Sequence, residues 1–172
     1  GPAGKTGPCG PDSEIFFWVG ESPAPRALDV ADRRWVELWN NVFMAYEKTA
    51  SGTIVPLPRA NVDTGMGLER TLVAVNGGRS VFDSETMRPL LEVLRGFAKP
   101  GLERELRIVT DHLRAACFLI SDGVGPSNKD QGYVLRRLLR RCILLARQLE
   151  LPGDWFVHAV KSVPPMYDGQ YP

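Results

Sequence analysis

The chain has 172 residues, and 44% of them are hydrophobic, which is enough for a globular core and excludes a wholly disordered protein. Its 21 Lys and Arg residues nearly balance 20 Asp and Glu residues, so the net charge of +1 does not by itself indicate binding to nucleic acid. Because no run of about 18 apolar residues occurs, the sequence predicts no transmembrane helix and no membrane partner.

The first part of the chain predicts strands. Residues 1–10 are rich in Gly and Pro, which predicts a loop. Residues 13–19 are aromatic and β-branched, which is typical of a strand. Residues 35–48 have an ambiguous periodicity, for which we favour a second strand. A turn at residues 51–52 then returns the chain into a further strand, so a hairpin is predicted here.

Helices are predicted for the rest of the chain. Residues 66–76 predict a short helix that ends at Gly77, and residues 84–97 predict another that is capped by Asp83 or Ser84. Three more helices are predicted at residues 106–121, 133–149 and 155–163, the last of them ended by two prolines. The predicted fold class is therefore α+β: part of an antiparallel sheet with helices in residues 1–103, followed by an α-helical domain in residues 104–172.

Positive charge is concentrated in one segment. Residues 104–147 contain nine basic and four acidic side chains. Four arginines repeat with helical spacing and predict a cationic stripe that suits a phosphate backbone; they are Arg136, Arg137, Arg140 and Arg141. An ordinary solvated helix face is the alternative. The predicted apolar side of the same helix consists of Val134, Leu135, Leu138, Leu139, Cys142, Ile143 and Leu145.

The segment VDTGMGLER, residues 62–70, places a carboxylate and an arginine around two glycines. Asp63 could hold a cationic amine, and Arg70 could bind a phosphate oxygen through its fork of donors. Gly65 and Gly67 would allow a ligand to approach the backbone closely. The alternative is a plain helix start in which Asp63 or the next residue is the cap.

The segment ELWNNVF, residues 37–43, sets polar residues among apolar ones. It predicts a pocket floor in which Glu37 holds a divalent ion, while the Asn40 amide and the small Val42 side chain contact a substrate. The alternative is a strand with one satisfied amide.

The three cysteines, Cys9, Cys117 and Cys142, lie far apart and form no CxxC pair. A disulfide scaffold and a zinc site are therefore not expected, and reduced thiols are typical of a cytoplasmic protein.

Five segments of the chain occur in the order typical of one family. They are GPCGPDSEIF, WNNVFMAYEK, VDTGMGLER, DHLRAACFLISDGVGPSN and GYVLRRLLRR. Through these five segments the chain resembles the alanyl-tRNA synthetases, and VDTGMGLER is similar to motif 3 of the class II synthetases. The resemblance implies an alanine–tRNA ligase that uses ATP and Mg²⁺ and binds the acceptor stem of tRNA-Ala.

The resemblance also implies roles for single residues. Arg70 would contact the ATP phosphates, with Gly67 beside the nucleotide, and Glu37 would help to hold Mg-ATP. The alanine site would be formed by Asp63, which receives the α-ammonium group, together with Asn40, Val42 and Gly65. Asn128 would read the G3·U70 pair of the acceptor stem, and the stem backbone would be held by Arg136, Arg137, Arg140 and Arg141.

Other parts of the family pattern are not found in these 172 residues. They are motifs 1 and 2, the editing domain with its zinc-binding cluster and the C-terminal domain. We therefore expect the downstream half of a catalytic domain plus the start of a tRNA-recognition domain, inactive in isolation. A non-catalytic tRNA-binding module, or one chain of a split synthetase that pairs with the upstream part, is the alternative.

Overall fold

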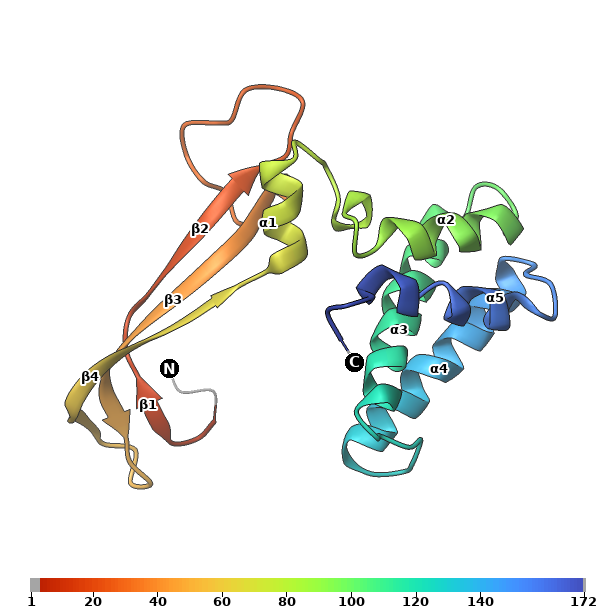
Figure 1. The fold of residues 1–172 in the computed structure, drawn as a ribbon. Helices are drawn as coiled ribbons and strands as arrows, with labels where there is room; N and C mark the ends of the chain where they lie inside the picture. Colours follow the sequence, from red (N-terminus) through yellow and green to blue (C-terminus); the bar gives the residue numbers. More distant parts are fainter. Residues whose placement is uncertain (1–3, 172) are drawn as a thin grey trace. The chain divides into compact units, whose positions relative to one another are not determined.

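The computed structural model describes residues 4–171, and the chain divides into two compact units, Gly1–Val81 and Phe82–Pro172 (Figure 1). The first unit contains an antiparallel sheet and one helix, and the second contains helices. The predicted α+β class is thereby confirmed.

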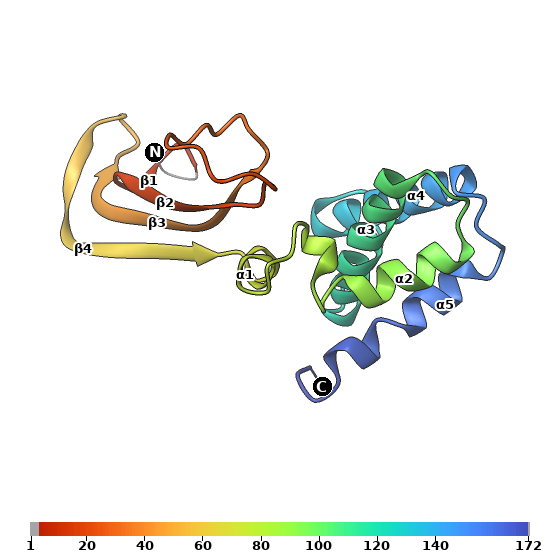
Figure 2. The same ribbon diagram turned by 90° about the horizontal axis from the view of Figure 1, so that it is seen from above.

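The sheet is built around one long strand. This strand, β3 (Trp35–Lys48), pairs along one edge with β1 (Gly7–Cys9) and β2 (Asp12–Trp18), and along the other edge with β4 (Ile54–Met66). All of these pairings are antiparallel, and Figure 2 shows how strongly β4 bends along its length. The ambiguous segment 35–48 is a strand over its full predicted length.

The segment predicted as an N-terminal loop contains the short strand β1. Its Gly and Pro content is typical of a loop, so the sequence did not predict this strand. Between β1 and β2 the chain passes close to β3 at Gly10, where an added Cβ would lie 1.8 Å from the main-chain oxygen of Phe43. The main-chain N–H of Phe43 donates to the Pro11 oxygen at 2.9 Å. Only a glycine fits this close approach between two strands.

The strand β4 continues further than predicted. It runs to Met66, and the helix α1 (Leu68–Val75) begins two residues later, so the predicted helix start at residue 66 was wrong. The junction is fixed by the Gly67 N–H, which donates to the Leu38 oxygen of β3 at 2.9 Å. Strand pairing thus holds the chain extended up to the first helical residue.

In its described residues the second unit contains four α-helices and a C-terminal 3₁₀ turn, and a short 3₁₀ helix, η1 (Val81–Asp83), leads into it. The helices are α2 (Arg88–Phe97), α3 (Glu103–Ser121), α4 (Asp130–Gln148) and α5 (Trp155–Lys161). The helix α2 starts later than predicted, because residues 84–87 form a turn in which the Ser84 oxygen accepts from the Met87 and Arg88 N–H groups. The two prolines that were predicted only to end a helix begin the 3₁₀ turn η2 (Pro164–Tyr167).

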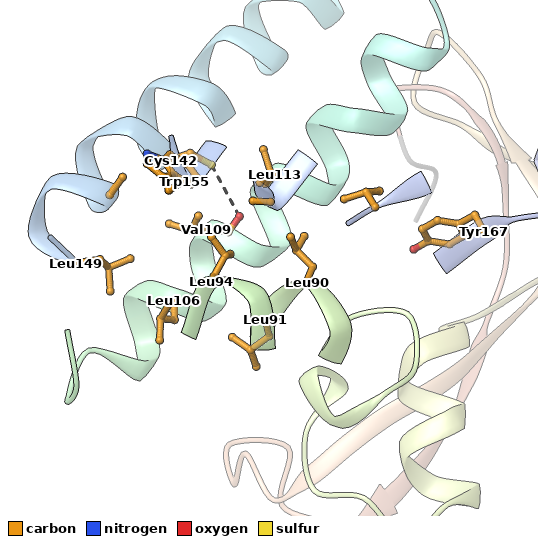
Figure 3. Close-up of a cluster of buried hydrophobic side chains, with 13 residues drawn as sticks. Leu90, Leu91, Leu94, Leu106, Val109, Leu113, Cys142, Leu149, Trp155 and Tyr167 are labelled. Atoms are coloured by element: carbon orange, nitrogen blue, oxygen red, sulfur yellow. Dashed lines mark hydrogen bonds between the residues drawn. The ribbon is translucent and has the colours of Figure 1, made fainter. Parts of the chain in front are cut away.

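The helical unit has a continuous hydrophobic core. Leu90 and Leu94 of α2, Val109 and Leu113 of α3, and Cys142 of α4 are at most 1% exposed (Figure 3). Because α2 packs into this core, the compact helical unit begins at Phe82. The assignment of separate functions to residues 1–103 and 104–172 stays a prediction.

The sheet unit buries far less. Among its described residues the buried hydrophobic side chains are Cys9 and Val73. Several large apolar side chains on the strands are between 37% and 58% exposed; among them are Ile15, Phe17, Trp39, Phe43, Val62 and Met66. Among residues 4–171 no helix is both long and apolar enough to cross a bilayer.

Candidate functional site

The strand register brings predicted site residues from two strands onto one face of the sheet. Asn40 of β3 lies opposite Gly65 of β4, and Val42 lies opposite Asp63. Directly opposed residues of an antiparallel pair point to the same side, and residues two apart along a strand do so as well. These four residues therefore form one continuous surface, although more than 20 positions separate the two on β3 from the two on β4.

A bulge adds Glu37 to this surface. Phe16 of β2 pairs with Glu37 and Ile15 pairs with Trp39, so Leu38 is an extra residue in β3. In a regular strand, residues three apart point to opposite faces, whereas the extra residue returns Glu37 to the side of Asn40. We call this side the polar face; its residues are Asp12, Glu14, Phe16, Glu37, Asn40, Val42, Asp63 and Gly65.

Side-chain hydrogen bonds agree with this division into faces. On the polar face the Asn40 Nδ2 group donates to Glu14 Oε1 at 3.2 Å. On the opposite face Trp39 Nε1 donates to Thr64 Oγ1 at 2.5 Å, and Thr64 Oγ1 donates to Asn41 Oδ1 at 2.7 Å. The two neighbouring asparagines thus serve different surfaces, and only Asn40 lies with the other predicted site residues.

Arg70 reaches β3 from the helix α1. Its Nη1 atom donates to the main-chain oxygen of Glu37 at 2.9 Å and lies 3.8 Å from the Glu37 carboxylate. The side chain folds back over Gly67, where an added Cβ would lie 3.1 Å from Arg70 Cδ. Gly67 therefore makes room for the arginine itself, while a Cβ at Gly65 would meet no atom within 4 Å.

The polar face carries more acid than the sequence interpretation assigned to it. Asp12 and Glu14, which lie opposite Val42 and Asn40, were not predicted as site residues. The signal was available in the alternation of DSEIFFW, which places these two carboxylates on one side of β2. With Glu37 and Asp63 they give the face a strongly acidic character.

This chemistry fits a magnesium ion that is shared with a nucleotide. Mg²⁺ is usually held by one or two carboxylates together with substrate phosphates and water. The Glu37 side chain is 39% exposed and beside Arg70, so both a cation ligand and a phosphate donor face the same space. Residues 4–171 contain no group of three or more His, Cys, Asp or Glu side chains arranged for a metal ion.

In the helical unit, Asn128 lies in the loop just before α4. Arg136 of α4 donates to the Asn128 Oδ1 atom, so the loop residue and the helix are in direct contact. All four predicted arginines of α4 are exposed, and the Arg137 guanidinium lies 6.0 Å from the centre of the Tyr133 ring. The structure therefore presents a basic surface at the predicted place.

The apolar side of α4 was predicted only in part. Leu135 and Cys142 are fully buried, as expected. Val134 and Ile143, which were predicted on the same apolar side, are 41% and 53% exposed, so only part of that side faces the core. The buried stripe follows Leu135, Cys142, Ala146 and Leu149, the residues that face the core, and Ile143 and Leu144 lie exposed near the arginines.

Comparison with known proteins gives a match over nearly the whole chain. Residues 2–172 match the profile of the family described as tRNA synthetases class II (A). The alanine–tRNA ligase of Treponema pallidum is 43% identical over 182 aligned residues, and that of Borreliella burgdorferi is 40% identical over 181. The alanine–tRNA ligase of Magnetococcus marinus is 40% identical over 179.

These alignments cover 98–100% of this chain, but 30% of the first two relatives and 20% of the third. The chain thus spans less than a third of the length of the relatives that it matches. The alignments nevertheless span both compact units. With the family profile matched from residue 2 to residue 172, the chain belongs to the alanyl-tRNA synthetase family of the class II tRNA synthetases.

Proposed function

We propose that this chain supplies the alanine-binding and ATP-binding surface of a cytoplasmic alanine–tRNA ligase, together with part of its acceptor-stem recognition surface. The observation that carries the proposal is the polar face. There the register of β3 and β4 and the bulge at Leu38 gather Glu37, Asn40, Val42 and Asp63, and Arg70 contacts Glu37 beside them.

On this face the Asp63 carboxylate would hold the α-ammonium group of alanine. The charge-assisted hydrogen bond between the two gives both binding energy and orientation. Val42 lies opposite Asp63, and its short side chain would limit the space for the substrate side chain. Asn40 and Gly65, one pair further along the strands, would complete the pocket.

ATP would bind next to alanine. Arg70 would donate to a phosphate oxygen and stabilise negative charge as it develops there, and Glu37 would hold Mg²⁺ on the same phosphates. When bound, the ion supplies charge neutralisation of the triphosphate. The alanine carboxylate then attacks the α-phosphorus. The bond between the α-phosphorus and the oxygen that bridges to the β-phosphorus breaks, and pyrophosphate leaves with the electron pair.

The helical unit would bind the tRNA acceptor stem. Asn128 would reach the minor groove of the stem, which is wide and shallow in A-form RNA and displays base edges, and would read the G3·U70 pair. The exposed arginines of α4 would contact phosphates and carry no sequence information.

A second candidate function is a non-catalytic tRNA-binding module, or one chain of a split synthetase. It is favoured by the contrast between the two units: the helical unit has a complete core of its own, while the sheet exposes Ile15, Trp39 and Phe43. A sheet usually has at least one covered face, so this one would need further protein to work as a catalytic site.

Alanine-dependent exchange between ATP and labelled pyrophosphate separates the two candidates. Exchange by the 172-residue chain that is lost in Asp63→Asn supports the ligase. The matched control is Asp29→Asn in the exposed loop after β2, which should keep the exchange. Absence of exchange combined with binding of a tRNA-Ala acceptor-stem hairpin supports the binding module, and absence of both overturns the proposal.

A further inference from the structure

We propose that Gly132 and Arg136 are positioning residues that fix Asn128 for reading the acceptor stem. The inference rests on the proposed recognition of the stem by Asn128. It gives Arg136 a task that differs from that of the other arginines of α4, which the sequence treats as equivalent phosphate ligands.

The first observation is the close packing of Gly132 against the loop that precedes α4. A Cβ added at Gly132 would lie 2.3 Å from Ser127 Oγ and 2.5 Å from the main-chain oxygen of Gly125. One of these atoms belongs to the backbone, so a larger residue would have to displace the loop itself. The substitution would therefore move the segment that leads into Asn128.

The glycine is not needed for its backbone angles. Gly132 lies within α4 and is not among the glycines with positive φ. A glycine inside a helix is less favourable than alanine. Space for the loop is therefore the physical reason for a glycine at this position.

The second observation is that Ser127, just before Asn128, is hydrogen-bonded to the start of α4 and to the residue after Asn128. The Ser127 N–H donates to the Gly132 oxygen at 3.0 Å, and Ser127 Oγ donates to the Lys129 oxygen at 2.9 Å. Just after it, Asp130 has a φ of 49°, a left-handed conformation that is uncommon for a residue other than glycine. The main chain around Asn128 is thus held by its surroundings.

The third observation concerns the Asn128 side chain. Arg136 donates to Asn128 Oδ1. A guanidinium group has only donors, so this contact requires the amide oxygen to face Arg136 and turns the Nδ2 group away from it. Gly132 thus fixes where residue 128 lies, and Arg136 fixes how its amide is oriented.

The test measures the affinity of the 172-residue chain for two RNA hairpins that copy the tRNA-Ala acceptor stem and differ only in a G·U or a G·C third pair. The readout is the dissociation constant for the G·C hairpin divided by that for the G·U hairpin, both measured at one salt concentration. Gly132→Ala and Arg136→Met should each lower this ratio at least about threefold, because a displaced or rotated amide loses its contact with the base pair.

Two controls separate positioning from other effects. Gly96→Ala, at a helical glycine of α2 where a Cβ would meet nothing within 4 Å, should leave the ratio unchanged. Arg140→Met removes the same charge from α4 and should weaken both hairpins equally. In the Asn128→Ala background, Arg136→Met should cause no further loss of selectivity, since coupled residues are not additive.

The proposal is overturned if Arg136→Met weakens both hairpins equally, as Arg140→Met does, or if Gly132→Ala leaves the ratio intact. Failure of the proposed function would give a different result. The unaltered chain would then show no preference between the two hairpins, or Asn128→Ala would leave that preference unchanged. Amide hydrogen exchange gives a readout without RNA: the Ser127 N–H should lose protection in Gly132→Ala and keep it in Gly96→Ala.

Discussion

Arg70 donates a hydrogen bond of 2.9 Å to the main-chain oxygen of Glu37, which joins the first turn of α1 to the central strand. The contact uses Nη1, the same atom that lies 3.8 Å from the Glu37 carboxylate. The guanidinium group has five N–H donors in a planar fork, so it can keep this bond and still bind a phosphate. The arginine therefore holds α1 to β3 and keeps donors for the phosphate-binding role that we propose.

Arg70→Lys should weaken the binding of Mg-ATP by about tenfold or more, because lysine keeps the charge but cannot hold the Glu37 oxygen and a phosphate in one fixed plane. Isothermal titration calorimetry of the chain with Mg-ATP measures this. Arg33→Lys in the exposed loop before β3 is the control and should bind normally. Equal affinities for Arg70→Lys and the unaltered chain would remove Arg70 from the nucleotide site.

Arg137→Ala should weaken binding to every acceptor stem by a similar factor. It should also reduce the slope of log K against log salt by about 0.7–0.9, the value for one released counterion per phosphate contact. Binding is followed by fluorescence anisotropy from 50 to 200 mM salt, conditions chosen for a large salt effect. Arg26→Ala, in the loop between β2 and β3, should keep the original slope; an unchanged slope in Arg137→Ala would place Arg137 outside the RNA surface.

Gly10→Ala should destabilise the sheet unit by about 2 kcal/mol, because the new Cβ would collide with the Phe43 oxygen. Three of the four tryptophans, Trp18, Trp35 and Trp39, lie in this unit, so fluorescence during urea unfolding reports on it. Gly96→Ala meets open space and should be neutral or slightly stabilising. An unfolding curve for Gly10→Ala that coincides with that of the unaltered chain would show that β1 does not hold this close approach in solution.

Burial raises the pKa of the Cys142 thiol to about 12, and the nearby Asp111 carboxylate acts in the same direction. The folded protein therefore keeps this thiol protonated at pH 8, where it should resist iodoacetamide until the helical unit unfolds. Since the thiol ionises more easily when unfolded, its contribution to stability should fall as the pH rises from 9 toward 12. Mass spectrometry of labelled peptides follows the reaction, and fast labelling of Cys142 in the native protein would contradict its burial.

Local patterns predicted much of the fold. The aromatic and β-branched content of residues 13–19 predicted β2, and a strand was favoured for residues 35–48, which form β3, in spite of their ambiguous periodicity. The position of β1 could not be read in this way, because its pairing with β3 outweighs the turn preference of its Gly and Pro residues. Tertiary packing likewise decided which apolar residues of α4 are buried.

The candidate site shows the same limit. The types of its residues were evident in two short segments, and the resemblance to a family supplied their roles. Their meeting on one face depends on the register of β3 with β4, which no local pattern specifies. The alternation of β2 places Glu14 on one side of that strand, but it does not say that β2 lies beside Asn40, so Glu14, which binds the Asn40 amide, was missed.

The extra residue at Leu38 makes the composition of the polar face depend on the number of residues between Glu37 and Asn40. Replacing Leu38 by another side chain leaves that number unchanged and keeps both residues on one side. Inserting one more residue would turn Glu37 toward the side of Trp39 and Phe43, without altering any of the amino acids that bind ligands. A scan of substitutions would therefore pass over this segment, whereas a scan of single-residue insertions would identify it as essential.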